Sequence, residues 1–128
     1  MALPGINAVK ILYTLVSVAI LVLGVLHMAT TFRLSSSAGF KVWFFGAGIA
    51  MALSGALNLL NRRYGFAAFG LRVVCIVTNV LMVCFAGVAG RVTGASAWEQ
   101  VVMLSVLSSA LILSALGPAS LSSQVPGS

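Results

Sequence analysis

Few side chains in this 128-residue sequence could take part in chemistry. The sequence contains one histidine, His27, one acidic residue, Glu99, and two cysteines. An imidazole can titrate near neutral pH or bind a metal, but a metal site needs about three or four ligands, and no His, Cys, Asp or Glu recurs in register with His27. Nucleophilic catalysis needs a base aligned with a nucleophile and an orienting acid, which so few groups cannot supply. We therefore expect neither a catalytic site nor a metal site, and a haem or quinone bound through His27 stays an open alternative.

Two interpretations are open for Glu99. The segment Ser96-Ala97-Trp98-Glu99 fits the capping box, in which an N-cap Ser and a Glu three residues later satisfy each other's backbone N–H groups. A carboxylate there also suits the positive end of a helix. Alternatively, Glu99 acts as a gate or as a proton partner of His27, because both residues fall at the same end of the predicted helices. Capping is the favoured interpretation.

A second group of candidates is polar and recurs at helical spacing inside apolar segments, so that its members share one face of each helix. The candidates for contact with a ligand or solute are Ser17, His27, Ser54, Asn58 and Asn79. A similar stripe near the C-terminus holds Trp98, Ser105, Ser108 and Ser109. Such stripes either pack helices together through close approach and hydrogen bonds or line a polar route for a solute. Packing is the favoured interpretation for the stripes as a whole, whereas for Asn79, near the middle of its helix, both interpretations stay open.

Four segments almost without charge must position these side chains. Residues 11–32, 42–61 and 73–90 contain no Asp, Glu, Lys or Arg, and residues 98–117 contain only Glu99. A helix of about 20 residues crosses a hydrocarbon core of about 30 Å. Hydrophobic residues make up 61% of the chain and charged residues 6%, which is too little polar surface for a soluble protein. The sequence therefore predicts an all-α integral membrane protein.

The predicted architecture is a four-helix transmembrane bundle that forms a single domain over residues 1–118, with helices at about 8–32, 42–61, 67–90 and 97–117. Short connections make each helix antiparallel to the next. The bundle is therefore expected to run up-down-up-down, with both termini on the same side of the membrane. Residues 119–128 are Ser-rich and uncharged, and we expect a disordered C-terminal tail.

The positive charges lie singly at the predicted helix ends, where they suit phospholipid headgroups. Because they form no basic cluster, nucleic acid is not an expected partner. The terminal side of the bundle holds Lys10, Arg62, Arg63 and Arg72, and the opposite side holds Arg33, Lys41 and Arg91. The small excess on the terminal side predicts cytoplasmic termini by the positive-inside rule, in a bacterial inner membrane.

Three small residues on one stripe of the second helix, Gly48, Ala52 and Gly55, are candidates for close helix packing. Because four helices enclose little interior, we also expect this stripe to serve a homo-oligomer or a larger membrane complex. The working hypothesis is a small membrane protein, with no required cofactor, that binds or passes a small solute, ion or amphiphile. The alternative is a non-catalytic accessory or structural subunit of a larger membrane complex.

Overall fold

The computed structural model describes residues 4–116. These residues form four helices: α1 (Pro4–Thr31), α2 (Ala38–Tyr64), α3 (Phe69–Thr93) and α4 (Ala97–Leu116). Each is long and apolar enough to cross a bilayer. The predicted fold class is confirmed: the protein is all-α, and its four long apolar helices pack as a bundle. It is a small multi-pass membrane protein whose outer side chains contact lipid.

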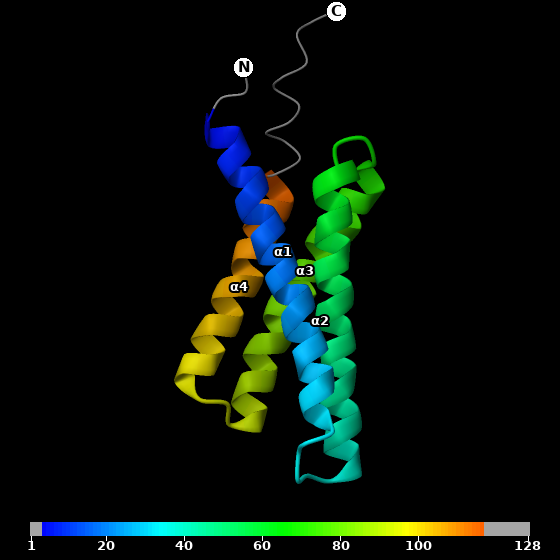
Figure 1. Ribbon diagram of the computed structural model, residues 1–128, viewed down its shortest axis with the longest axis vertical. Helices are drawn as coiled ribbons and strands as arrows, with labels where there is room; N and C mark the ends of the chain where they lie inside the picture. The colour runs from blue at the N-terminus through cyan, green and yellow to red at the C-terminus, as the bar shows by residue number, and fades with distance from the viewer. Residues whose placement is uncertain (1–3, 117–128) are drawn as a thin grey trace, which may run out of the picture.

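The helices are arranged as two antiparallel hairpins (Figure 1). The first hairpin joins α1 to α2 and the second joins α3 to α4, and these two pairs make the most extensive helix contacts in the described chain. Contacts between the hairpins are sparser. The hairpins lie together near the described chain ends and spread apart towards the α1–α2 and α3–α4 connections (Figure 1). We call these two ends of the bundle the terminal end and the loop end.

Several helix ends differ from the predicted positions: α1 begins at Pro4 rather than at about residue 8, α2 ends at Tyr64 rather than at 61, and α3 begins at Phe69 rather than at 67. Local caps account for two further differences. α2 begins at Ala38 rather than at residue 42, since the Ser37 hydroxyl accepts a hydrogen bond from the backbone N–H of Phe40 (3.3 Å) and caps the helix. α3 continues to Thr93 rather than to residue 90, and Gly94 ends it with a left-handed backbone conformation (φ 66°). The tail predicted at residues 119–128 lies outside the described residues.

The small residues of α2 pack against α1 of the same chain. A Cβ added to Gly24 would lie 2.7 Å from the Gly48 carbonyl oxygen and would also meet the backbone of Ala52. A Cβ added to Gly55 would lie 2.8 Å from the Ser17 carbonyl oxygen. The two helix backbones therefore approach as closely as Gly allows. Because α1 covers the small residues of α2, these residues offer no surface to a second copy of the chain. The stripe therefore no longer supports the expectation of an oligomer.

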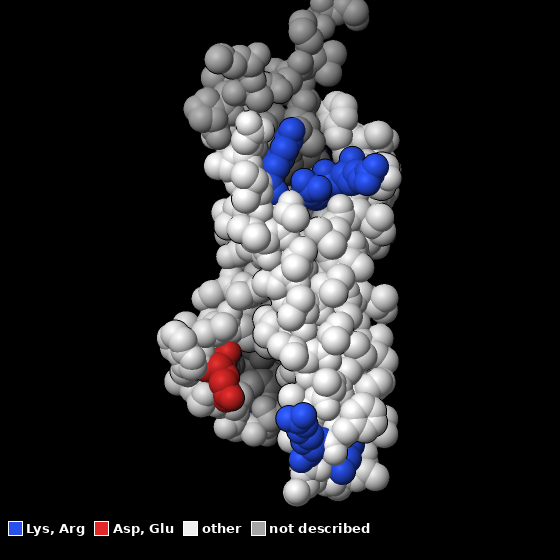
Figure 2. Space-filling view, in the orientation of Figure 1, with Lys and Arg blue, Asp and Glu red and all other residues white. Residues whose placement is uncertain are grey.

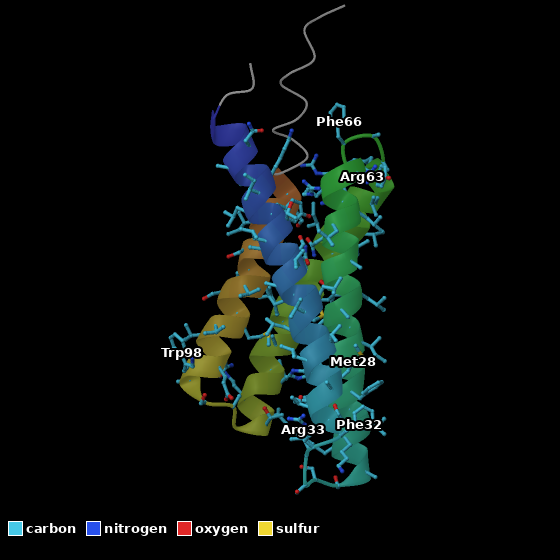
Figure 3. All side chains as sticks on the ribbon, viewed as in Figure 1. Met28, Phe32, Arg33, Arg63, Phe66 and Trp98 are labelled. Carbon is cyan, nitrogen blue, oxygen red and sulfur yellow. The ribbon has the colours of Figure 1, made fainter. Side chains whose placement is uncertain are left out.

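The interior faces predicted for α1, α2 and α3 agree with the buried side chains, whereas the face predicted for α4 is wrong. Trp98 is 75% exposed and lies on the outer side of the bundle (Figure 3), so it is not part of the buried interior. The Ser109 hydroxyl donates to the Ser105 carbonyl one turn earlier (2.7 Å), so Ser109 is satisfied within its own helix and needs no partner from another helix. The buried residues of α4 are Leu107, Ala110, Leu113 and Ser114.

Charged side chains occupy the two ends of the bundle. On the face shown in Figure 2, the Lys and Arg side chains gather near the terminal end and the loop end, and an uncharged band lies between them. Large apolar side chains are exposed along all four helices. An apolar band between two rings of cations is the pattern expected of a protein embedded in a bilayer.

Candidate functional site

Side-chain hydrogen bonds join α1, α2 and α3 in the half of the bundle nearer the terminal end. Asn58 of α2 and Asn79 of α3 form a reciprocal pair, in which each amide nitrogen donates to the other amide oxygen at 2.9 Å. The Tyr13 hydroxyl of α1 donates to the same Asn58 oxygen (3.0 Å). The Ser54 hydroxyl donates to the Asn79 oxygen (3.3 Å). We call these side chains, together with Asn61, the polar network.

Asn61 extends the polar network to α4. Its amide nitrogen donates to the Tyr13 hydroxyl (2.9 Å) and to the Ser114 carbonyl oxygen (3.3 Å). At the next residue of α4, the Arg72 guanidinium donates to the Ala115 carbonyl oxygen (2.6 Å) and so satisfies part of the last turn of α4. Hydrogen bonds thus connect all four helices in this half of the molecule.

All the predicted solute contacts except His27 form hydrogen bonds within this half of the bundle. Asn58, Asn79 and Ser54 bond to one another, and each is at most 1% exposed. Ser17 is equally buried, and its hydroxyl donates to the Tyr13 carbonyl oxygen of its own helix (2.6 Å). The structure therefore brings these candidates together, and their bonds close within the protein.

Two central members of the polar network, Tyr13 and Asn61, are not among the predicted ligand contacts, although helical spacing places both on the interior faces of α1 and α2. Tyr13 is 1% exposed and Asn61 is fully buried. The signal was present in the helical spacing, because Tyr13 precedes Ser17 by one turn and Asn61 follows Asn58 on the same face. A tyrosine hydroxyl can both donate and accept, so the Tyr13 hydroxyl links the Asn58 amide, to which it donates, with the Asn61 amide, from which it accepts.

A cavity of about 450 Å³ lies between the two hairpins in the half nearer the loop end. Three methionines, Met51, Met82 and Met103, contribute to its wall. The aromatic side chains that line it are Phe40, Trp43, Phe44, Phe85 and Trp98. Since the members of the polar network do not line it, the bundle has a polar, closed half and an apolar, hollow half.

Four polar side chains line this cavity, and each also makes contacts within the protein. His27 stacks on Phe44, with ring centroids 3.8 Å apart and an angle of 18° between the planes. The Gln100 amide donates to the Gly87 carbonyl oxygen (3.2 Å), and Thr93 donates to a carbonyl one turn earlier. The fourth is Glu99, the only acid in the chain, which lies at the edge of a hollow in Figure 2.

The Glu99 carboxylate has the capping geometry that the sequence predicts, and it also lines the cavity. One of its oxygens accepts from the Ser96 backbone N–H (3.0 Å) and from the Ser96 hydroxyl (2.8 Å). The Ser96 hydroxyl in turn accepts from the Glu99 backbone N–H (3.3 Å). His27 and Glu99, which were candidates for convergence, line one cavity from different hairpins.

Comparison with protein-family models, curated proteins and solved structures finds no match. Function must therefore be argued from the geometry of this chain. Among the described residues, no group of three His, Cys, Asp or Glu side chains could hold a metal ion. The cavity at the loop end has room for another molecule.

Proposed function

We propose that this protein is a non-catalytic membrane protein that binds a small amphiphile in the cavity between its two hairpins. The observation that carries the proposal is the cavity itself, with its aromatic and methionine wall and a few polar groups. Ligand pockets commonly measure about 300 to 1,000 Å³ and combine an apolar wall with a small number of polar contacts. Methionine side chains adapt to ligands of different shape.

The composition of the cavity wall favours an amphiphile over a hydrated solute or ion. An ion that leaves water needs polar groups to replace its hydration shell, and the amides best suited to this, Asn58 and Asn79, are bonded to each other. An amphiphile needs apolar contact for its body and a few polar partners for its head. Trp43 and Phe85 offer the first, and His27 and Glu99 offer the second.

A probe of the cavity can use the tryptophans as reporters, because the chain has only two and both line the cavity. In zwitterionic nanodiscs, N-phenyl-1-naphthylamine, a neutral apolar fluorophore, is expected to show saturable energy transfer from Trp43 and Trp98. The same titration with nanodiscs that lack this protein measures the background fluorescence of the fluorophore in lipid.

A substitution that fills the cavity should weaken the energy transfer from the tryptophans to the fluorophore. Ala86 lines the cavity, and Ala86→Leu is expected to weaken binding of the fluorophore by at least about tenfold, because the added atoms occupy its volume. Ala29→Leu is the matched control, since Ala29 lies on an exposed position of α1, and it should bind as the wild type does. Equal binding by both variants would place the fluorophore outside the cavity and contradict the proposal. A stable complex with larger subunits and no saturable binding would favour the accessory-subunit alternative.

We further propose that both termini face the cytoplasm of a bacterial inner membrane, which places the cavity near the opposite surface. Four cations at the terminal end against three at the loop end support this orientation. In the double variant Arg62→Gln, Arg63→Gln the count becomes two against three (4 − 2 = 2), and a C-terminal topology reporter is expected to shift from the cytoplasmic towards the external signal. An external signal from the wild type would contradict the proposed orientation.

A further inference from the structure

The charge on the cavity wall is confined to one residue. Among the side chains that line the cavity, Glu99 alone carries a formal charge at neutral pH. The three cations of the loop end, Arg33, Lys41 and Arg91, do not line it. The cavity therefore presents a negative group in an otherwise uncharged wall.

The geometry of Glu99 keeps this charge fixed at the cavity. Both hydrogen bonds from Ser96 go to the same carboxylate oxygen, so the side chain is oriented while its second oxygen stays available to a ligand. Hydrogen bonds of this kind favour the ionised carboxylate. The positive end of α4 offsets part of the charge, since a helix terminus carries about half an elementary charge, but a full carboxylate charge exceeds it at contact distance.

Aromatic rings extend from the cavity wall in a connected group. The Phe40 ring lies 6.0 Å from that of Trp43 and 5.9 Å from that of Phe44. Trp43 in turn lies 5.8 Å from Phe85 of the other hairpin. The faces of such rings attract cations through their quadrupole, most strongly where water is excluded.

We propose that the ligand of this cavity is a hydrophobic cation: an apolar body with an amine or quaternary ammonium head near Glu99. This inference rests on the proposed function, because it names the class of amphiphile that the same cavity selects. A carboxylate and aromatic faces both favour a cation and disfavour an anion. The cations at the loop end do not line the cavity, and salt screens all exposed charges here, Glu99 included, over about 8 to 10 Å, so the preference depends on direct contact between the ligand head and the Glu99 carboxylate.

Competition between ligands with the same apolar body tests the charge. Decyltrimethylammonium, decanoate and decanol are titrated against bound N-phenyl-1-naphthylamine in zwitterionic nanodiscs. Decyltrimethylammonium is expected to displace the fluorophore at a concentration at least about tenfold lower than decanoate does. Glu99→Gln should reduce this preference to less than about threefold, because a Gln can still cap the helix but carries no charge.

Arg91→Gln is the control for the general electrostatic potential of the loop end. Arg91 is exposed and does not line the cavity. Its substitution removes one positive charge, whereas Glu99→Gln removes one negative charge, and we expect the wild-type preference for the cation to remain. A gain in cation preference in Arg91→Gln that matches the loss in Glu99→Gln would overturn the proposal in favour of a surface effect.

The three competitors also separate failure of this inference from failure of the proposed function. Displacement by all three at equal concentrations, or best by decanoate, would overturn the cationic ligand while the cavity remains a binding site. Absence of saturable fluorophore binding in the wild type, together with no effect of any competitor, would overturn both proposals.

Discussion

Asn58→Leu is expected to lower the free energy of unfolding by about 2–4 kcal/mol. The substitution removes the acceptor of the Tyr13 hydroxyl and both bonds of the reciprocal pair with Asn79. The Asn79 amide would then lie buried with only its longer contacts, and a buried polar group that loses its partner costs more than the bond itself contributed. Reversible unfolding in mixed micelles, followed by circular dichroism, measures the change.

The double-mutant cycle with Asn79→Leu tests whether the reciprocal pair causes the loss. Replacing both amides leaves neither one unpaired, so the double variant should be about 2 kcal/mol more stable than the sum of the single changes predicts. Asn7→Leu is the control, because Asn7 is exposed on α1, and it should change stability little. Strict additivity in the cycle would show that the two amides are not coupled and would contradict this account of the interior.

Gly24→Ala should destabilise the protein by about 2–3 kcal/mol although it adds a single methyl group. The added Cβ would meet backbone atoms of Gly48 and Ala52, which cannot rotate away as a flexible side chain can, so α1 and α2 must separate along their whole contact. The same unfolding measurement reports the loss.

Gly46→Ala supplies the matched control on α2. A Cβ added to Gly46 meets nothing within 4 Å, so this variant should be as stable as the wild type or slightly more stable, because Ala favours a helix more than Gly does. Equal losses from Gly24→Ala and Gly46→Ala would indicate a general effect of glycine on the helices and would contradict the close approach described here.

The sequence predicts those parts of the structure that depend on one helix at a time. Apolar length identifies all four spans, and helical spacing places Ser54 and Asn58 on the interior face of α2. The capping geometry of Glu99 also follows from residues close in sequence. On α4 the same reasoning fails, because the Ser109 hydroxyl bonds to a carbonyl oxygen of its own helix, and a serine satisfied in this way does not indicate which face is interior.

The cavity could not be predicted, since it depends on how the two hairpins sit against each other. Its wall combines His27 of α1, Trp43 of α2, Phe85 of α3 and Glu99 of α4. No spacing within one segment relates these residues. The role of Gly48 shows a similar limit: the residue type indicates close packing, but only the fold shows that the partner is α1 of the same chain rather than a second copy.

The division of the polar network between the hairpins has a consequence for biogenesis. When the ribosome has delivered α1 and α2, the glycine contact between them can already form, and Asn58 has Tyr13 as a partner. The second amide of the reciprocal pair, Asn79, has not yet arrived. At this stage the Asn58 amide still has partners, because its oxygen accepts from Tyr13 and its nitrogen donates to the Ser54 carbonyl oxygen of its own helix (2.8 Å), so the first hairpin can enter the bilayer before the second is made. Arrival of α3 adds the reciprocal bonds with Asn79, and arrival of α4 adds the Ser114 carbonyl oxygen as a partner of Asn61, so the polar network is complete only when the second hairpin has joined the first.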